Sequence, residues 1–463
     1  MRWRVQAGRV ATAETSRSVL WNPRRRTFTA GLVLVITLVA FEAMGLGTAL
    51  PTIVAEFGAQ HWYSWPFTVF LAASAIGTVI GGRLSDRRGP AVPLLLALPT
   101  FAVGLLVAGF ATNMLVLLVA RVLQGLAGGV LIVALYVMIA RVFPEEHRPA
   151  AFGALSSAWV VPALVGPVVS GALTEQASWR WVFLGLAPLV CIGAVMLVPT
   201  ARRFGARSAD PPVPRPGLPL AAVGAAGGVV ALNWAAQDPS WSSLLVGLVG
   251  VAALVPSLRL LLPKGTLRAR PGIPRMVLSR GLLSGLFFTA QAFVPLALTV
   301  VHHYSPTTAG VPLTVGSVGW TAGALWQSRQ RDLRRERVVA AGFALVGTGI
   351  AGLALSLPAW GPHGLVFACW FVAGCGMGIG VTSTSVRVLS LSAEGERGFN
   401  SAALQISDML GQAALVGLGG VVVAALATSA SPARGVAPLD LALLVAALLT
   451  ALALVRATRN RTS

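Results

Sequence analysis

The chain has 463 residues, of which 56% are hydrophobic and only 11% are charged. This composition, with a mean hydropathy of +0.78, lies well outside the range of soluble proteins. A net charge of +20 would suggest nucleic-acid binding in a soluble protein, but here the basic residues are spread over many short, separate segments. We therefore expect no nucleic-acid partner, and we expect basic loops that contact anionic lipid head groups.

Fourteen continuous apolar segments follow one another, beginning near Phe28 and ending near Val455. A bilayer core of about 30 Å needs roughly 20 apolar residues per helix, whereas the strands of a membrane barrel would alternate apolar and polar residues. The segments therefore predict helices joined by short loops, without a soluble domain. The predicted spans are 28–50, 63–82, 91–111, 114–140, 152–173, 181–200, 218–236, 243–263, 276–300, 308–328, 338–358, 363–386, 400–427 and 437–456.

The basic residues alternate between the gaps. All but three of the 35 lysines and arginines are assigned to the N-terminal tail or to every second gap; Arg180 and Arg434 fall in the opposite gaps, and Arg121 lies inside an apolar segment. Cytoplasmic loops are enriched in Lys and Arg, so the pattern predicts a multi-pass protein of the plasma (inner) membrane with both termini in the cytoplasm. Residues 1–27 have no apolar core, so they are not expected to be a signal peptide.

Two gaps, 201–216 and 264–275, are longer and richer in Pro and Arg than the others. They divide the helices into six, two and six. Two six-helix halves suggest an internally repeated transporter whose bundles rock about a midplane site. The predicted parts are a cytoplasmic tail (1–27), an N-terminal bundle (28–200), linkers with a central helix pair (201–275), a C-terminal bundle (276–456) and a second cytoplasmic tail (457–463).

Charged residues inside the apolar segments are the first candidates for function. Glu42 and Arg121 lie within predicted spans, and Asp408 is a third candidate. A charge at a helix centre costs about 2.5–3.5 kcal/mol on insertion scales. Burial raises the pKa of a carboxyl and a nearby arginine lowers it, so we hypothesise that Glu42 is the main proton and substrate-cation site, with Arg121 as its partner. The alternative is a static pair, or two separate polar contacts between helices.

Several glutamines are candidates for a substrate cavity. Gln405, Asp408 and Gln412 share one helix face, which either lines a central cavity or forms a polar seam between helices. Gln291 lies in the aromatic-rich stretch 287–293. That stretch suits a cavity for amphipathic substrates, since aromatic faces attract cations; the alternative is lipid-facing packing.

The segment 82–89, GRLSDRRG, lies between the second and third predicted spans. It resembles the signature loop G-x-L-[small]-D-R-x-G of the major facilitator superfamily. The resemblance implies a conformational latch built from Gly82, Asp86, Arg87 and Gly89, in which the glycines allow a sharp turn and the charges pair across the cytoplasmic face. The alternative is a solvated basic loop that only orients the helices.

Two further motifs resemble elements of the same superfamily. The sequence RVLQG at 121–125 is similar to its R-x-x-Q-G element, which makes Gln124 a cavity candidate. The sequence PALVGPVVSG at 162–171 resembles a Gly-Pro helix element associated with antiporters, and it places Gly166 and Pro167 at the expected helix bend.

WRWVF at 179–183 and ALPTI at 49–53 resemble the fourteen-span drug:proton antiporter family. The resemblance covers 28–200 well and extends more loosely over 267–406. It implies an all-α membrane protein of the major facilitator fold, with two six-helix bundles and two additional central helices. It also implies proton-coupled efflux of amphipathic or cationic compounds, with small molecules, protons and membrane lipid as partners.

Two other functions stay open: an uptake or metabolite carrier on the same fold, and a lipid-handling or non-transporting membrane protein. The chain has no G-x-x-x-x-G-K-[ST] phosphate loop and no cluster of His, Asp and Glu with metal-ligand spacing. We therefore expect neither a cofactor nor a metal, and we do not expect an enzyme.

Overall fold

The structure is a computed structural model that describes residues 20–22, 25–204, 217–237, 240–330, 335–393, 396–428 and 433–459. Within these ranges the regular elements are all helices, which confirms the predicted all-α fold. Residues 205–216, which make up most of the first predicted linker, lie outside the described residues, as do 1–19 and 460–463 of the two tails.

Fourteen helices of the described part have 18 or more residues. They are α2 (Arg26–Glu56), α3 (Trp65–Arg88), α4 (Ala91–Gly109), α5 (Met114–Val142), α6 (Arg148–Gln176), α8 (Leu186–Phe204), α9 (Leu218–Ala235), α10 (Trp241–Leu261), α11 (Ile273–Val300), α12 (Pro306–Arg329), α13 (Arg335–Ser356), α14 (Val366–Leu391), α15 (Arg397–Leu426) and α16 (Val436–Arg459). Shorter pieces are η1 (Gln60–Trp62), η2 (Glu145–His147), α7 (Trp181–Leu184), η3 (Thr266–Arg268) and η4 (His363–Leu365).

The chain is a multi-pass membrane protein, because 13 helices of the described part are long and apolar enough to cross a bilayer. The fourteenth long helix, α12, is richer in Gly, Ser and Thr than the others. It packs against α6 and α14, where small residues allow close helix contact.

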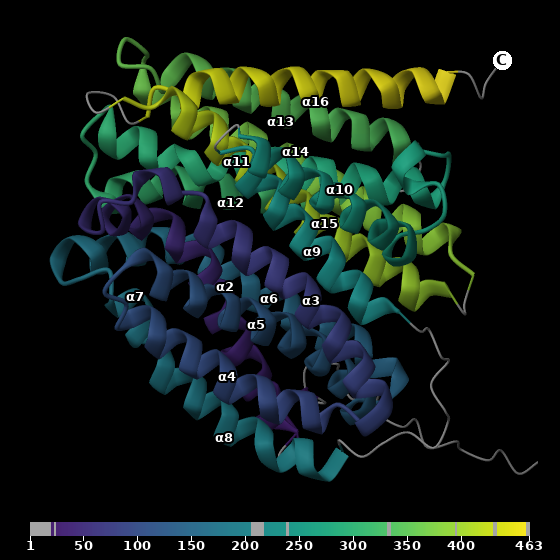
Figure 1. The fold of residues 1–463 in the computed structure, drawn as a ribbon. Coiled ribbons are helices and arrows are strands. Elements are labelled where there is room, and N and C mark those ends of the chain that lie inside the picture. The colour runs from purple at the N-terminus through teal and green to yellow at the C-terminus, as the bar shows by residue number, and fades with distance from the viewer. Residues whose placement is uncertain are drawn as a thin grey trace, which may run out of the picture.

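The helices form two bundles with an additional pair between them (Figure 1). We call α2–α8 the N-half and α11–α16 the C-half. Helix α9 packs on α10 and contacts both α3 of the N-half and α15 of the C-half. We call the end of the molecule that holds α7 the α7 end, and the end at which α3 finishes with Arg87 and Arg88 the arginine end.

Glycines let the helix backbones touch within each half. On α3, a Cβ at Gly77 would meet the carbonyl of Leu126 on α5, and on α5 a Cβ at Gly129 would meet the carbonyl of Ser74. The C-half repeats this arrangement between α12 and α14, where Gly323 faces the carbonyl of Cys375. Small residues at such crossings replace the hydrophobic driving force that is absent in a bilayer.

Proline inside α6 is accommodated by a neighbouring helix. Pro162 has no N–H to donate to the carbonyl of Ala158, four residues earlier. The hydroxyl of Thr37 on α2 donates to that carbonyl over 3.2 Å. A freed carbonyl in a membrane helix needs such a partner, so this bond supports α6 against α2.

The prediction of a loop at 82–89 is wrong, because residues 82–88 belong to helix α3. Helix α3 continues through residue 88, and the turn comes only at Gly89, which has φ of 81° and donates its N–H to the carbonyl of Ser85 over 2.9 Å. Only glycine adopts that backbone conformation readily. The nearest atom to a Cβ at Gly82 would be Val133 Cγ1 at 3.9 Å, so the close approach to α5 is made instead by Gly77 and Gly81.

We predict that Gly129→Ala destabilises the protein and that Gly128→Ala does not. A Cβ at Gly129 would press on the α3 backbone at Ser74 and Thr78, whereas a Cβ at Gly128 meets no described atom within 4 Å. Overpacking of this kind costs about 1–3 kcal/mol. Thermal unfolding of the two purified variants in detergent checks this, and equal melting temperatures would contradict it.

Candidate functional site: a cavity between the two halves

A cavity of about 330 Å³ lies between the halves, and both contribute to its wall. The N-half supplies Val39, Ala43, Met44, Gly47, Phe67, Phe70, Leu71, Ser74, Arg121, Gly128, Ile132 and Trp159. The C-half supplies Arg280, Phe288, Gln291, Ala292, Leu313, Trp320, Gln405, Asp408, Met409, Gln412 and Val416. A mostly apolar pocket with a few convergent polar groups is the usual form of a small-molecule site.

Aromatic side chains line both walls of this cavity. Phe67, Phe70 and Trp159 come from the N-half, and Phe288 and Trp320 come from the C-half. The rings of Phe288 and Trp320 lie 6.1 Å apart, centroid to centroid. Aromatic faces offer large apolar contact area and also attract cations, so the walls suit amphipathic molecules.

Arg121 of α5 forms an ion pair with Glu42 of α2, and both side chains are buried. The guanidinium also donates to Gln124 Oε1 over 2.9 Å and to the carbonyl of Pro66 over 3.2 Å. Its carbon lies 4.1 Å from the centre of the Phe70 ring. These contacts join three helices of the N-half and offset the cost of burying the charge.

Glu42 and Gln124 do not belong to the described cavity wall. Helix α2 turns Val39, Ala43 and Gly47 toward the cavity, and Glu42 lies behind them, in contact with Arg121. Gln124 is fully buried and is not among the described residues that line this cavity; a role for it in substrate binding stays a prediction. It lies one helical turn beyond Arg121 and orients that guanidinium through the hydrogen bond to Oε1.

The polar face of α15 looks into the cavity. Gln405, Asp408 and Gln412 all line it, as does Gln291 of α11. These side chains therefore lie on the cavity wall, and two of them, Gln405 and Asp408, also make polar contacts to neighbouring helices. Gln405 also reaches across to the other half, where its side chain hydrogen-bonds the hydroxyl of Tyr136 on α5.

Arg280 is a cavity residue that the sequence pattern missed. It lies inside the predicted span 276–300, yet the alternation of basic residues assigns it to the basic side; the structure places it on the cavity wall, paired with Asp408. Its position seven residues into α11 was the available signal. Asp440, in the first turns of α16, was also missed by the sequence pattern. It is buried, and it is not one of the described residues that line the cavity.

The halves meet closely at the α7 end, where α6 faces α12. A Cβ at Gly171 of α6 would meet the backbone of Pro306, and a Cβ at Gly310 of α12 would meet the carbonyl of Pro167. Pro167 of the predicted element therefore lies at the contact between the halves, whereas Gly166 faces Met44 and Phe41 of α2 in its own half.

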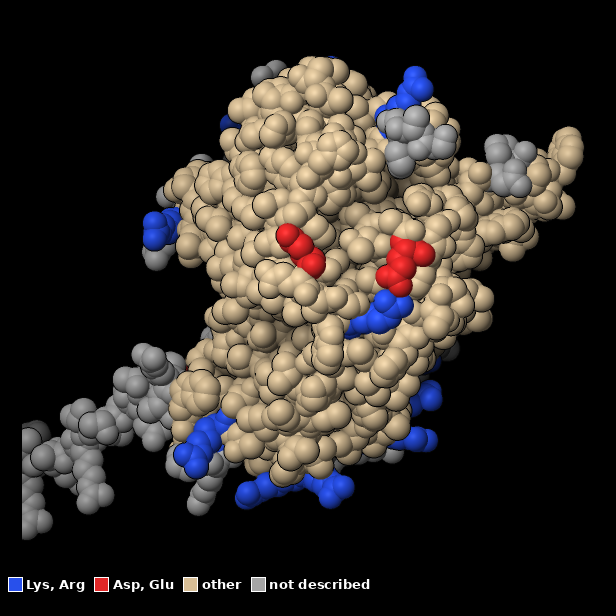
Figure 2. Space-filling model, turned by 90° about the vertical axis from the view of Figure 1, so that its left-hand side faces the viewer, with Lys and Arg blue, Asp and Glu red and all other residues tan. Residues whose placement is uncertain are grey.

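Glu175 and Thr307 add a polar contact to this closure. The carboxylate of Glu175 accepts from the hydroxyl of Thr307 over 2.5 Å and from its N–H over 3.4 Å. Because Thr307 lies in the first turn of α12, the carboxylate also meets the positive end of that helix dipole. Figure 2 shows this end of the molecule as a largely uncharged face that carries two separate acidic patches.

Helices α3 and α15 close the other side of the same end. A Cβ at Gly420 of α15 would meet the side chain of Ser64. The hydroxyl of Tyr63 donates to the carbonyl of Ala292 on α11 over 2.8 Å, and its ring lies 5.4 Å from that of Phe293. The cavity is thus separated from the α7 end by contacts on both sides.

The residues of the predicted latch lie at the arginine end. Asp86 and Arg87 are exposed on the last turn of α3. Asp86 interacts with the charge of Arg83, one turn earlier on the same helix. A role for Gly82, Asp86, Arg87 and Gly89 in a latch between conformations stays a prediction.

Residues 32–415 match the family model of the Major Facilitator Superfamily. The chain belongs to this superfamily of membrane transporters. It is therefore a transporter and not an enzyme.

Relatives with assigned names are transporters as well. The chain is 29% identical over 407 residues to a probable multidrug-efflux transporter of Mycobacterium tuberculosis, a match that covers 81% of this chain and 82% of the relative. It is also 29% identical over 330 residues to an MFS-type transporter of the acurin A biosynthesis cluster of Aspergillus aculeatus. That match covers 66% of this chain and only 58% of the longer fungal protein.

Solved structures share the fold. A bacterial homologue of the human lysosomal transporter Spinster superposes with a TM-score of 0.70 at 14% identity, covering 95% of this chain and 98% of that one. A peptide transporter of the POT family, in complex with alafosfalin, gives a TM-score of 0.69 at 17% identity, with 93% and 94% covered.

We predict that Arg121→Ala destabilises the protein more than the double change Glu42→Gln with Arg121→Ala. The single change leaves the buried Glu42 carboxylate without its partner, which costs about 3–5 kcal/mol. Denaturation of both variants and of Glu42→Gln closes a double-mutant cycle. Additive effects would show that the two side chains do not act as a pair.

We predict that Glu175→Ala makes the cavity more accessible from the α7 end. The test labels a cysteine placed at Ser74, on the cavity wall, in a background whose three native cysteines are replaced. A membrane-impermeant maleimide added at the α7 side should react several-fold faster in the Glu175→Ala variant. Glu56→Ala is the matched control, because Glu56 bonds Trp179 and Arg180 of its own half; an equal increase there would contradict the role of Glu175.

Proposed function

We propose that this protein is a proton-coupled secondary transporter that exports small amphipathic or cationic compounds by alternating access. The observation that supports this most directly is a buried carboxylate–arginine pair whose arginine lies on the wall of a cavity that both halves share, with the carboxylate behind it. The named efflux relative supports the direction of transport. The aromatic walls support the class of substrate.

Glu42 would act on the cavity through Arg121. A proton on the carboxylate removes the negative charge that holds the guanidinium, so Arg121 would then present an uncompensated positive charge to the cavity. A cationic substrate binds less well beside that charge, which links proton loading to substrate release. This order of events is that of an antiporter.

The coupling needs two conformations that expose the cavity in turn. We propose that residues 28–200 rock against 276–456 about the cavity, with 201–275 as linkers and central pair. The contacts of α6 with α12 at the α7 end would have to open for release on that side. The latch residues Asp86 and Arg87 would stabilise the other conformation, which is open at the α7 end and closed at the arginine end.

The proposed location is the plasma (inner) membrane, with both termini and the arginine end in the cytoplasm, as the distribution of basic residues favours. In that orientation, each proton that enters at a membrane potential of 100 mV supplies about 2.3 kcal/mol. An uptake carrier on the same fold is the second candidate, because Arg121 and the cavity would serve either direction of transport.

We predict that cells expressing the wild-type protein accumulate less of a lipophilic cation than cells without it, and that a protonophore abolishes the difference. Glu42→Gln should abolish most of the export, because its side chain cannot cycle a proton. Glu336→Gln is the control: Glu336 pairs with Arg387 between α13 and α14, and neither residue lines the cavity.

Accumulation assays of wild type and both variants, with equal amounts of protein in the membrane, check this prediction. A Glu42→Gln variant that exports as well as the wild type would remove Glu42 from the mechanism. A wild type that raises accumulation of the compounds would favour uptake instead.

A further inference from the structure

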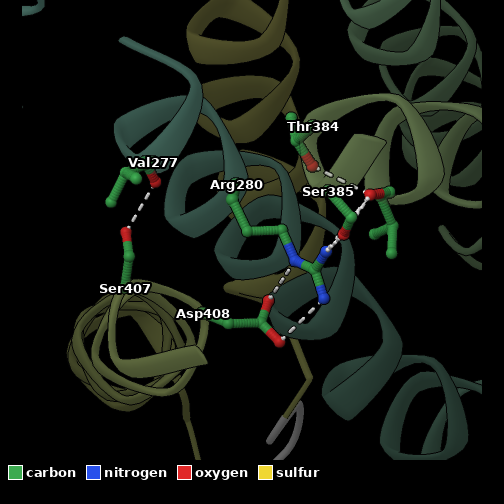
Figure 3. Close-up of polar contacts among 7 residues, drawn as sticks. Val277, Arg280, Thr384, Ser385, Ser407 and Asp408 are labelled. Atoms are coloured by element: carbon green, nitrogen blue, oxygen red, sulfur yellow. Dashed lines mark hydrogen bonds and ion pairs between the residues drawn. The ribbon is translucent and has the colours of Figure 1, made fainter. Parts of the chain in front are cut away.

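The C-half carries its own arginine–carboxylate pair on the cavity wall. Arg280 of α11 donates from Nε to Asp408 Oδ1 of α15 over 3.2 Å and from Nη2 to Oδ2 over 3.5 Å (Figure 3). Both residues line the cavity. Each half therefore places one arginine on the cavity and one carboxylate against it.

Arg280 is also held by contacts other than its ion pair with Asp408. Arg280 Nη1 donates over 3.2 Å both to the carbonyl of Val381 and to the hydroxyl of Ser385 on α14. The hydroxyls of Ser385 and Thr384 themselves bond the Val381 carbonyl, which ties this part of α14 together (Figure 3). The guanidinium therefore has two contacts on α14 that do not involve Asp408, and we expect these to keep it on the cavity wall when Asp408 is replaced.

The C-half pair is also more accessible than the N-half pair. The side chains of Arg280 and Asp408 are 16% and 22% exposed, against 1% for Arg121 and 0% for Glu42. A molecule in the cavity can therefore touch both members of the C-half pair. In the N-half it reaches only the arginine, because Glu42 lies behind it.

The charges around the cavity balance. The charged residues on its described wall are Arg121, Arg280 and Asp408, and Glu42 adds the second negative charge behind Arg121. With both carboxylates ionised, two positive charges face two negative ones. Other polar groups near the C-half pair, such as Gln405, Ser385 and the hydroxyl of Tyr136, carry no charge.

We propose that the Arg280–Asp408 pair sets the charge selectivity of this cavity. Each member masks the other, so the intact cavity takes amphipathic molecules with little preference for the sign of their charge. Without Arg280 the carboxylate of Asp408 recruits lipophilic cations, and without Asp408 the anchored guanidinium recruits lipophilic anions. This inference rests on the proposed function in one respect, that the cavity takes small amphipathic substrates.

The test uses two probes of the same shape and opposite charge, tetraphenylphosphonium and tetraphenylborate. Equilibrium binding of each to purified protein in nanodiscs is measured for wild type, Arg280→Gln and Asp408→Asn. Relative to wild type, Arg280→Gln should bind the cation at least tenfold tighter and the anion more weakly. Asp408→Asn should shift both affinities by similar factors in the opposite direction, since each variant exposes one unmasked charge.

If the pair had only a structural role, both variants would bind both probes more weakly than wild type. That result would overturn the proposal. So would a cation-to-anion preference that changes less than threefold, or the absence of binding of either probe to wild type and variants alike. The charge-swapped double variant, Arg280→Asp with Asp408→Arg, should return the preference to near the wild-type value, because both charges are again masked.

The matched controls come from the same half. Arg387→Gln and Glu336→Gln each break an ion pair of 2.9 Å between α14 and α13, outside the cavity, and should leave the preference unchanged. An equal shift in these controls would trace the effect to overall charge and overturn the proposal. Because equilibrium binding needs no proton gradient, a loss of proton dependence in the export assay would sink the proposed function and leave this inference standing.

Discussion

A charge enclosed by apolar helices must be paired, and this constraint explains the arrangement around the cavity. Arg121 has a carboxylate, a glutamine, a backbone carbonyl and an aromatic face as partners. Removing one member of such a group leaves the others buried without compensation. The same property that makes the pair costly to break makes it sensitive to a single proton, which supports its proposed place in coupling.

Close helix packing holds these charges in position. Glycines bring α3 against α5 in one half and α12 against α14 in the other, which keeps the walls of each half rigid. The contacts between the halves combine glycine crossings, at Gly171 and Gly310, with hydrogen bonds such as those of Tyr63 and Glu175 at the α7 end. Stiff halves joined by separable contacts are what alternating access needs.

Much of this arrangement follows from the sequence. The apolar segments predict the helices, because the backbone of a chain in a bilayer has to satisfy its own hydrogen bonds. Glu42 and Arg121 could be found because a charge deep in an apolar run is conspicuous, and the polar face of α15 follows from helical spacing. The sequence does not reveal Arg280 as a cavity residue, because it lies near the start of α11, where a basic residue also fits the alternation of the loops.

Other features depend on tertiary contacts that no local pattern reveals. Gln124 faces Arg121 and Gly104 rather than the cavity, and only the packing of α4 on α5 decides that. Residues 82–88 continue α3, since nothing before Gly89 breaks the helix. The pairing of Arg280 with Asp408 joins helices 128 residues apart in the sequence. Pairs of this kind can be identified only when the fold is known.

The most direct test of proton coupling is a measurement of protons rather than of substrate. In proteoliposomes that contain the purified protein and an enclosed pH-sensitive dye, a lipophilic cation is added on one side without an imposed proton gradient. We expect the substrate gradient to drive protons the opposite way across the membrane, and no such movement with Glu42→Gln. Substrate movement in the wild type without any change in internal pH would contradict the account.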